Sequence, residues 1–236
     1  MSGEARFRDR VDAGRQLADA LMGYRNQSPL VLGLSRGGVP VAFEVAQALG
    51  APLDVWVVRK IGAPGRPELG MGAIAEGAGA YLDRNALRRL GASQEAVQAA
   101  GEQAQRELER RSVLFRDGRP LPDVEGRTVI VVDDGVATGG TAHAVVRAIR
   151  ARHPRRLVLA VPVGALDAIA ALKNEVDDLV CPTTPTDLRA IGTWYEDFSQ
   201  MSDADVCALL AKARGRFPAQ PDLVVDGLEE AYRPND

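Results

Sequence analysis

The sequence has little of several features that would point to particular classes of protein. Its only two cysteines, Cys181 and Cys207, lie far apart and form no CxxC pair, which argues against a disulfide framework and favours a reducing compartment. The formal net charge of −3 offers no electrostatic case for binding nucleic acid. The opening MSGEARFRDR lacks the apolar segment of a signal peptide. The longest apolar stretch, at 157–166, is too short to span a bilayer. We therefore expect a cytoplasmic protein without a membrane or nucleic-acid partner.

Alternating strand and helix patterns indicate one large α/β domain in the 236 residues. Strands are expected at 29–34, 53–58, 128–132, 156–163 and 177–182, and helices at 7–22, 39–50, 84–115, 139–152 and 165–174. This alternation predicts a doubly wound, mainly parallel sheet flanked by helices. The Gly- and Pro-rich segment 61–72 is expected to be a mobile loop, followed by a small hairpin near 73–82.

Changes in composition divide the chain into three parts. An N-terminal helix occupies 1–28, the α/β core 29–182, and a segment of different character 183–236, with an aromatic cluster and then a helix capped by Ser202. We expect the last part to form a small hood over the core, with help from the N-terminal helix. Residues 216–236 are expected to be ordered only by packing on a neighbour.

The stretch TVIVVDDGVATGGT at 128–141 is the most informative part of the chain. A buried strand ends at two adjacent acids, Asp133 and Asp134, and a Gly/Thr-rich turn then leads into a helix. Ligands of parallel sheets bind at the carboxyl ends of strands, and helix N-termini bind anions. The stretch therefore predicts a sugar-phosphate site, although a generic strand-to-helix turn is the simpler alternative.

These residues resemble the PRPP-binding signature of type I phosphoribosyltransferases. The resemblance implies that Asp133 and Asp134 hold the ribose hydroxyls in a catalytic role. It also implies that the loop at 137–141 cradles the 5′-phosphate, through Ala137, Thr138, Gly139, Gly140 and Thr141. The ATGGT form is similar to that of the adenine-specific enzymes. Hypoxanthine-guanine enzymes carry an aspartate, their candidate general base, where this chain has Ala137, which argues against a direct copy of their mechanism.

A second segment, LGLSRGGVPVAFEVAQALG at 32–50, resembles the pyrophosphate loop of the same family, in the SRGG form of bacterial xanthine-guanine enzymes. The resemblance implies that Ser35, Arg36, Gly37 and Gly38 bind pyrophosphate, and that the Ser35–Arg36 peptide is cis. A simple strand-to-helix connection is the alternative.

The same residues also match the GxSxG nucleophile elbow of α/β-hydrolases, with Ser35 as nucleophile. Only one strand precedes Ser35, and the chain has just two histidines, His143 and His153, each inside or at the end of a helix. A hydrolase would also leave the diacid stretch unexplained.

The segment VVRKIGAPGRPELG at 57–70 resembles the strand end and flexible loop of the adenine-specific enzymes. The resemblance implies that Arg59 and Lys60 contact the diphosphate and that the loop closes over PRPP and excludes water. Paired surface charges are the alternative.

GTWYEDF at 192–198 resembles the short aromatic and acidic segment that covers the acceptor base in purine enzymes. Acceptor-binding candidates are Trp194 and Tyr195, by stacking, and Glu196 and Asp197, by hydrogen bonding or as a general base. An aromatic cluster that only anchors an appendage to its core is equally compatible with this pattern.

The resemblance covers 29–198 and implies a type I phosphoribosyltransferase of nucleotide metabolism. Such an enzyme moves the phosphoribosyl group of PRPP to a nitrogenous acceptor, most readily a nucleobase, and releases pyrophosphate. It implies Mg²⁺ as cofactor, bound through Asp134 directly or by water, and is compatible with a homodimer. A PRPP sensor without transferase activity remains open, and the acceptor cannot be read from the sequence.

Overall fold

The computed structural model describes residues 7–216, apart from the side chains of residues 67 and 68. Its elements in chain order are α1 (Arg10–Leu21), η1 (Met22–Gln27), β1 (Leu30–Leu34), α2 (Gly38–Leu49), β2 (Leu53–Trp56), β3 (Val58–Ala63), β4 (Arg66–Ala75), β5 (Ala80–Leu82), α3 (Arg84–Leu90), α4 (Gln94–Arg116), β6 (Thr128–Val132), α5 (Gly140–Arg150), β7 (Arg156–Ala160), α6 (Leu166–Leu172), β8 (Asp178–Val180), η2 (Ile191–Trp194) and α7 (Asp203–Arg216). No helix within 7–216 is long and apolar enough to cross a membrane. The expectation for the tail after residue 216 lies outside the described residues.

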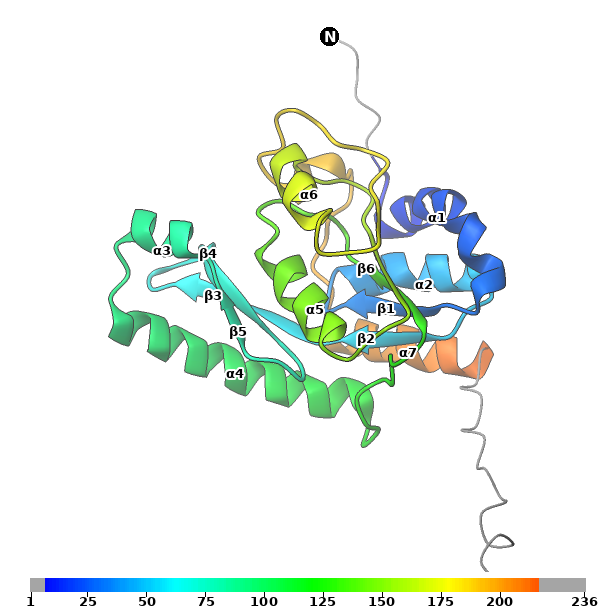
Figure 1. Ribbon diagram of the computed structural model, residues 1–236, viewed down its shortest axis with the longest axis horizontal. Coiled ribbons are helices and arrows are strands. Elements are labelled where there is room, and N and C mark those ends of the chain that lie inside the picture. Colours follow the sequence, from blue (N-terminus) through cyan, green and yellow to red (C-terminus); the bar gives the residue numbers. More distant parts are fainter. Residues whose placement is uncertain (1–6, 217–236) are drawn as a thin grey trace, which may run out of the picture.

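A five-stranded parallel sheet in the order β2-β1-β6-β7-β8 forms the centre of the molecule, as the sequence predicts (Figure 1). Every residue of β1 and β6 is buried. Val31 and Ile130 pack with residues of α1, α2 and α7 on one face, whereas Leu32 and Val131 pack with residues of α5 and α6 on the other. Coverage of both faces explains why these strands are apolar without interruption.

Local signals mark where several helices begin and end. The single helix expected at 84–115 is wrong, because Gly91 ends α3 and Ser93 begins α4. Gly50 ends α2 with φ of 64°, in the left-handed region that suits glycine. Ser93 caps α4 by accepting the N–H of Ala96 at 3.2 Å. Ser202 begins α7 through a reciprocal pair, in which each of Ser202 and Asp205 donates its backbone N–H to the other's side chain.

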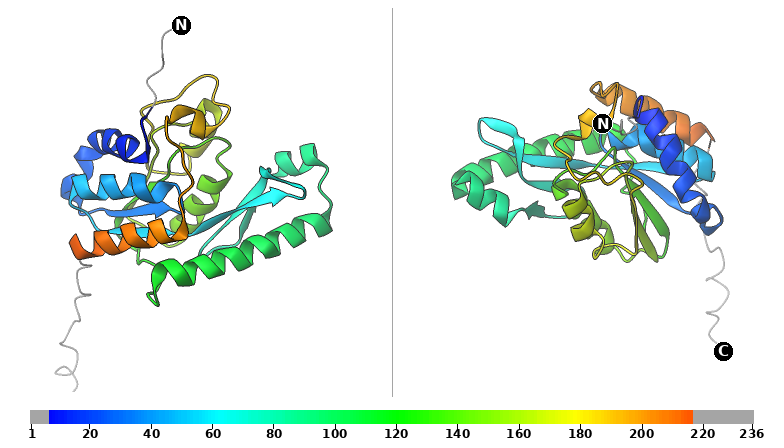
Figure 2. Two further views of the ribbon diagram at one scale, coloured as in Figure 1. Left: turned by 180° about the vertical axis from the view of Figure 1, so that it is seen from behind. Right: turned by 90° about the horizontal axis from the view of Figure 1, so that it is seen from above.

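A second, antiparallel sheet in the order β3-β4-β5 extends from one side of the core, with α3 and α4 beside it (Figures 1 and 2). It confirms the hairpin expected near 73–82, but the loop expected at 61–72 is wrong. Only Pro64 and Gly65 make a turn there, and the flanking residues belong to β3 and β4. Burial of Ile61 and Met71 holds these strands together despite their many glycines, so tertiary packing overrides the local signal.

The second sheet also changes the setting of Arg59 and Lys60. The sequence places them at the end of a strand over 53–58, but β2 ends at Trp56 and the pair lies inside β3. Successive side chains of a strand point to opposite faces. The side chains of Arg59 and Lys60 therefore start from opposite faces of β3.

Candidate functional site

The two motifs of the sequence meet where the sheet reverses its winding direction. β1 pairs with β2 on one side and β6 on the other, and Gly33 lies opposite Val132. The SRGG loop after β1 and the diacid loop after β6 therefore leave the same edge at the same level. In open α/β sheets this switch point is the crevice where ligands bind.

Glycines allow the SRGG loop to press against the diacid. A methyl group on Gly37 would stand 2.0 Å from Asp134 Oδ2, and one on Gly38 would stand 2.5 Å from the carbonyl oxygen of Val132. The Ser35–Arg36 peptide is cis, as the resemblance implies. Glycine at both positions is thus a steric requirement of the close approach.

Ser35 lacks the setting of a hydrolase nucleophile. Its Oγ accepts the backbone N–H of Val58 at 3.4 Å. His143 pairs instead with Glu175, Nδ1 to Oε1 at 3.0 Å, and within residues 7–216 neither histidine is hydrogen-bonded to Ser35. The described structure therefore offers no Ser-His pair for acyl transfer.

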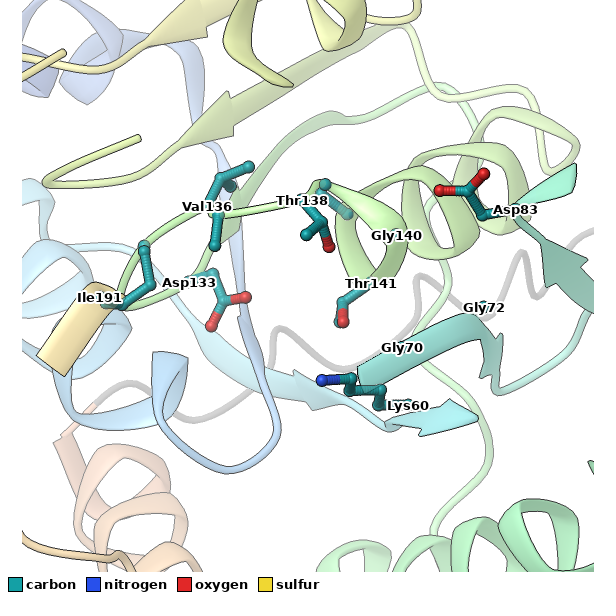
Figure 3. Close-up of a pocket in the computed structure, with 14 residues that line it drawn as sticks. Lys60, Gly70, Gly72, Asp83, Asp133, Val136, Thr138, Gly140, Thr141 and Ile191 are labelled. Carbon is teal, nitrogen blue, oxygen red and sulfur yellow. The ribbon is translucent and has the colours of Figure 1, made fainter. Parts of the chain in front are cut away.

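The phosphate-loop residues line a cavity of about 200 Å³ at this edge (Figure 3). Its walls are the loop at 135–142 together with Asp133, Lys60, Gly70, Gly72, Asp83 and Ile191. The N–H of Val136 donates to the carbonyl of Val163 at 3.0 Å and anchors the loop. The loop then opens into α5, whose first-turn N–H groups lack acceptors within the helix and can bind an anion.

Asp133 faces this cavity from a buried position. Its Oδ1 accepts the backbone N–H of Asp134 at 2.9 Å. Burial, followed by repulsion from Asp134, raises the pKa of Asp133 well above its usual value. A buried carboxylate in this state gains from ligands that donate hydrogen bonds or bring positive charge.

Asp134 is held from the opposite direction by the N-terminal helix. Arg10 of α1 donates from Nε to Asp134 Oδ2 at 2.8 Å, and Tyr195 donates its hydroxyl to the Asp134 carbonyl at 2.6 Å. Burial raises the pKa of Asp134, and the positive charge of Arg10 opposes that shift. The charge of Arg10 thus opposes the upward pKa shift of both acids, although more than 120 residues of sequence separate it from them.

The Arg-Lys pair divides between two environments. Lys60 lines the cavity, and its side chain passes so close to Gly70 that a methyl group there would lie 2.8 Å from Lys60 Cε. Figure 3 shows the Lys60 amine directed into the cavity. Arg59 lies instead within electrostatic reach of Glu107 and Arg111 of α4. The Arg36 side chain reaches the first turn of α7, with Nη1 at 3.5 Å from Asp203 Oδ1.

The predicted acceptor segment packs against the N-terminus. Trp194 and Tyr195 are 7 % and 4 % exposed and form a small core with Phe7. Glu196 and Asp197 donate their backbone N–H groups to the carbonyls of Phe7 and Arg8. None of the four candidates lines the cavity, so their packing favours the anchoring interpretation.

Ile191, at the start of η2, reaches the cavity from this same segment. A methyl group on Gly135 would stand 2.7 Å from its Cγ2. Sequence reasoning missed Ile191, Arg10, Asp83 and the glycines of β4. A period-2 reading of 66–75 could have found the strand, whereas nothing local links Arg10 to the diacid.

The chain matches the phosphoribosyl transferase domain family over residues 8–196, and it belongs to that family. It is 46 % identical over 211 residues to the Mycobacterium tuberculosis proteins "Putative phosphoribosyl transferase Rv0571c" (strain H37Rv) and "Putative phosphoribosyl transferase MT0597" (strain CDC 1551). That alignment covers 89 % of this chain and 48 % of theirs, so the chain spans about half the length of these relatives. The crystal structure of TT1426 from Thermus thermophilus is similar with a TM-score of 0.71 and 43 % identity, covering 88 % of this chain and 98 % of that one.

Proposed function

We propose that the chain is a phosphoribosyltransferase that binds PRPP in the switch-point cavity and transfers its phosphoribosyl group to a nitrogenous acceptor. Asp133 and Asp134 accept hydrogen bonds from the ribose hydroxyls, and the loop at 137–141 holds the 5′-phosphate. The bond between the anomeric carbon and the diphosphate breaks, a carbon–nitrogen bond forms, and the acceptor nitrogen gives up a proton. The observation that carries the proposal is the convergence of the phosphate loop, Asp133 and Lys60 on one cavity.

The site suits a catalyst that positions its substrate and stabilises a leaving group. Preorganised amides and a lysine are aimed at anionic oxygens, and charge on the departing diphosphate grows as the bond breaks. A base is needed only where the acceptor does not lose its proton unaided. Glu196, Asp197 and the acceptor itself are the candidate bases, and hydrogen bonds from Ser199 lower the pKa of Asp197.

The residues present fit Mg²⁺. Among the described residues, no group of three His, Cys, Asp or Glu side chains could hold a metal by itself. Mg²⁺ commonly uses one or two carboxylates and takes its other oxygens from substrate and water, which suits the adjacent carboxylates of Asp133 and Asp134. When bound, the metal would neutralise charge on the diphosphate.

The acceptor would lie against Ile191 and Val136, which form the apolar wall beside Asp133. Planar bases bind to such walls through dispersion and burial of apolar surface. A nucleobase is the acceptor class that we propose, and the buried Trp194 and Tyr195 pack in the same apolar cluster as Ile191.

Calorimetry with PRPP and MgCl₂ tests the site. We expect the wild type to bind and Asp133→Asn or Asp134→Asn to weaken binding about 100-fold, since each loses charge-assisted hydrogen bonds to ribose. Binding unchanged in both variants would overturn the proposed site. Pyrophosphate release across purines, pyrimidines and small amines then tests transfer, and PRPP binding without release on any of them would favour a PRPP sensor.

A further inference from the structure

Four arginines gather around two carboxylates where α4, α7 and the SRGG loop meet. This arginine cluster consists of Arg36 from the loop, Arg59 from β3, Arg110, Arg111 and Glu107 from α4, and Asp203 from the first turn of α7. Its cations outnumber its anions, although the chain as a whole carries a net charge of −3. An excess of guanidinium groups at one place is typical of sites that bind multivalent anions.

The interior of the cluster is incompletely hydrogen-bonded. Asp203 Oδ1 lies 3.5 Å from both Arg36 Nη1 and Arg111 Nε, yet Asp203 Oδ1 and Arg111 Nε are buried without a hydrogen-bond partner. The Arg111 side chain is only 8 % exposed. A buried donor without an acceptor is unfavourable, so an anion with more oxygen atoms than a carboxylate would satisfy these groups better.

The electrostatics of Arg111 agree with this geometry. Burial lowers its pKa, Glu107 and Asp203 oppose that shift, and the nearby charges of Arg36 and Arg59 add to it. Arg36 and Arg59 therefore lie close enough to repel Arg111. A further negative charge among the three would relieve their repulsion.

The cluster adjoins the proposed PRPP cavity through two separate segments of chain. Arg36 precedes Gly37, where an added methyl group would lie 2.0 Å from Asp134 Oδ2. Arg59 precedes Lys60, which lines the cavity. A ligand that extends from the cavity past Gly37 would meet the arginines next.

We propose that Arg111, which neither sequence motif supplies, is a further binding residue for the diphosphate of PRPP, beside Arg36 and Arg59. Arg110, at the exposed rim of the cluster, takes no part in binding. Asp203 is the resident counter-ion, and the diphosphate displaces its Oδ1 from Arg36 and Arg111. This inference rests on the proposed function and deepens it, because it makes α4 and α7 part of the substrate site. A salt-bridge network that only docks α7 would give Asp203 the opposite effect on affinity.

Calorimetry with inorganic pyrophosphate and with PRPP, both with MgCl₂, tests the role of Arg111. Arg111→Gln is expected to weaken both ligands about tenfold or more, since a buried charge-assisted contact to phosphate is lost. Arg110→Gln is the matched control, because Arg110 contacts the same Glu107 and Asp203 but has a side chain that is 51 % exposed. Arg110→Gln should change the affinity for either ligand by no more than about threefold. Thermal melting identifies any variant that fails to fold.

Asp203→Asn provides a test that misfolding cannot mimic, because the expected result is tighter binding of pyrophosphate. Removing the competing charge should tighten pyrophosphate binding about three- to tenfold, whereas Asp205→Asn, on the same turn of α7 and paired with Ser202, should not. Equal affinities of Arg111→Gln and Arg110→Gln, or weaker binding by Asp203→Asn, would overturn the inference while leaving the proposed function intact. Failure of the wild type to bind PRPP would overturn the proposed function itself.

Discussion

The parallel sheet and the antiparallel sheet border the same cavity, but they position their groups by different means. The parallel sheet contributes two acids and a backbone loop, which follow a strand buried along its whole length and contact glycines that admit no side chain. The antiparallel sheet contributes Lys60 from a strand that has exposed residues beside buried ones. Groups on the parallel sheet are therefore fixed by burial and close backbone contact, whereas Lys60 reaches the cavity through a long side chain.

Apolar packing of β3 and β4 with the core strands and a buried ion pair at its base attach the antiparallel sheet to the core. Arg116, at the end of α4, donates to both carboxylate oxygens of Glu76 and to the carbonyl of Val55. Such pairs specify one arrangement of two elements more than they add stability. Both sheets are therefore fixed by apolar burial, and the ion pair adds a directional contact between them.

Glycine substitutions are expected to give the largest difference in effect between the two regions. Gly37→Ala should weaken PRPP binding about 100-fold or more, because a methyl group 2.0 Å from Asp134 Oδ2 must displace that carboxylate from Arg10. Gly101→Ala in α4 meets nothing within 4 Å and should instead stabilise the helix by about 0.5–1 kcal/mol. Calorimetry and thermal melting measure both effects, and normal binding by Gly37→Ala would refute the tight fit.

Replacing the lysine of the second sheet should have an intermediate effect. Lys60→Met is expected to weaken PRPP binding about tenfold, because one charge-assisted contact to phosphate is lost while the acids and the loop stay in place. Lys173→Met removes the same charge from the exposed end of α6 and serves as the control. Equal affinities in the two variants, measured by calorimetry, would show that the second sheet contributes no direct contact.

The two acids should have opposite effects on stability without ligand. Asp134→Asn leaves Arg10, with a side chain 11 % exposed, without its ionic partner and should destabilise the protein by about 1.5–3 kcal/mol. Asp133→Asn removes a charge that burial disfavours and should raise the melting temperature by about 2–4 °C.

The stability effect of Asp133→Asn should depend on pH. Because the pKa of Asp133 is raised in the folded protein, stability present below about pH 4, its unfolded pKa, is lost as the pH rises through the folded value. The advantage of Asp133→Asn over the wild type should therefore grow from about pH 4 toward neutrality. Melting curves across that range measure it, and a constant difference would contradict the raised pKa.

Removing the cap of α4 should have the smallest effect. Ser93→Ala loses the hydrogen bond from the N–H of Ala96 and should lower the free energy of unfolding by about 1 kcal/mol. Faster amide exchange confined to the first turns of α4, with PRPP affinity unchanged, would show that this end of the helix acts independently of the cavity. A loss of affinity would mean that the second sheet and its helices transmit strain to the core.

Much of the core was predictable because its signals are local. The strand at 128–132, the caps Ser93 and Ser202, and the terminating Gly50 each depend on neighbours in sequence. The strands at 58–63 and 66–75 were missed because their glycines suggested a loop, and only packing of Ile61 and Met71 shows otherwise. The roles predicted for the individual site residues stay predictions until ligand binding is measured.

Sequence alone determined the α/β class and the two loops at the strand ends, since strand periodicity and glycine-rich turns depend only on residues close together in the chain. Tertiary structure decided which groups meet: Arg10 with Asp134, Lys60 with the phosphate loop, and Asp203 with Arg36 and Arg111. These contacts join segments that lie far apart in the chain, so no local pattern encodes them. The charge balance of the site, which depends on distance and burial, follows from the fold.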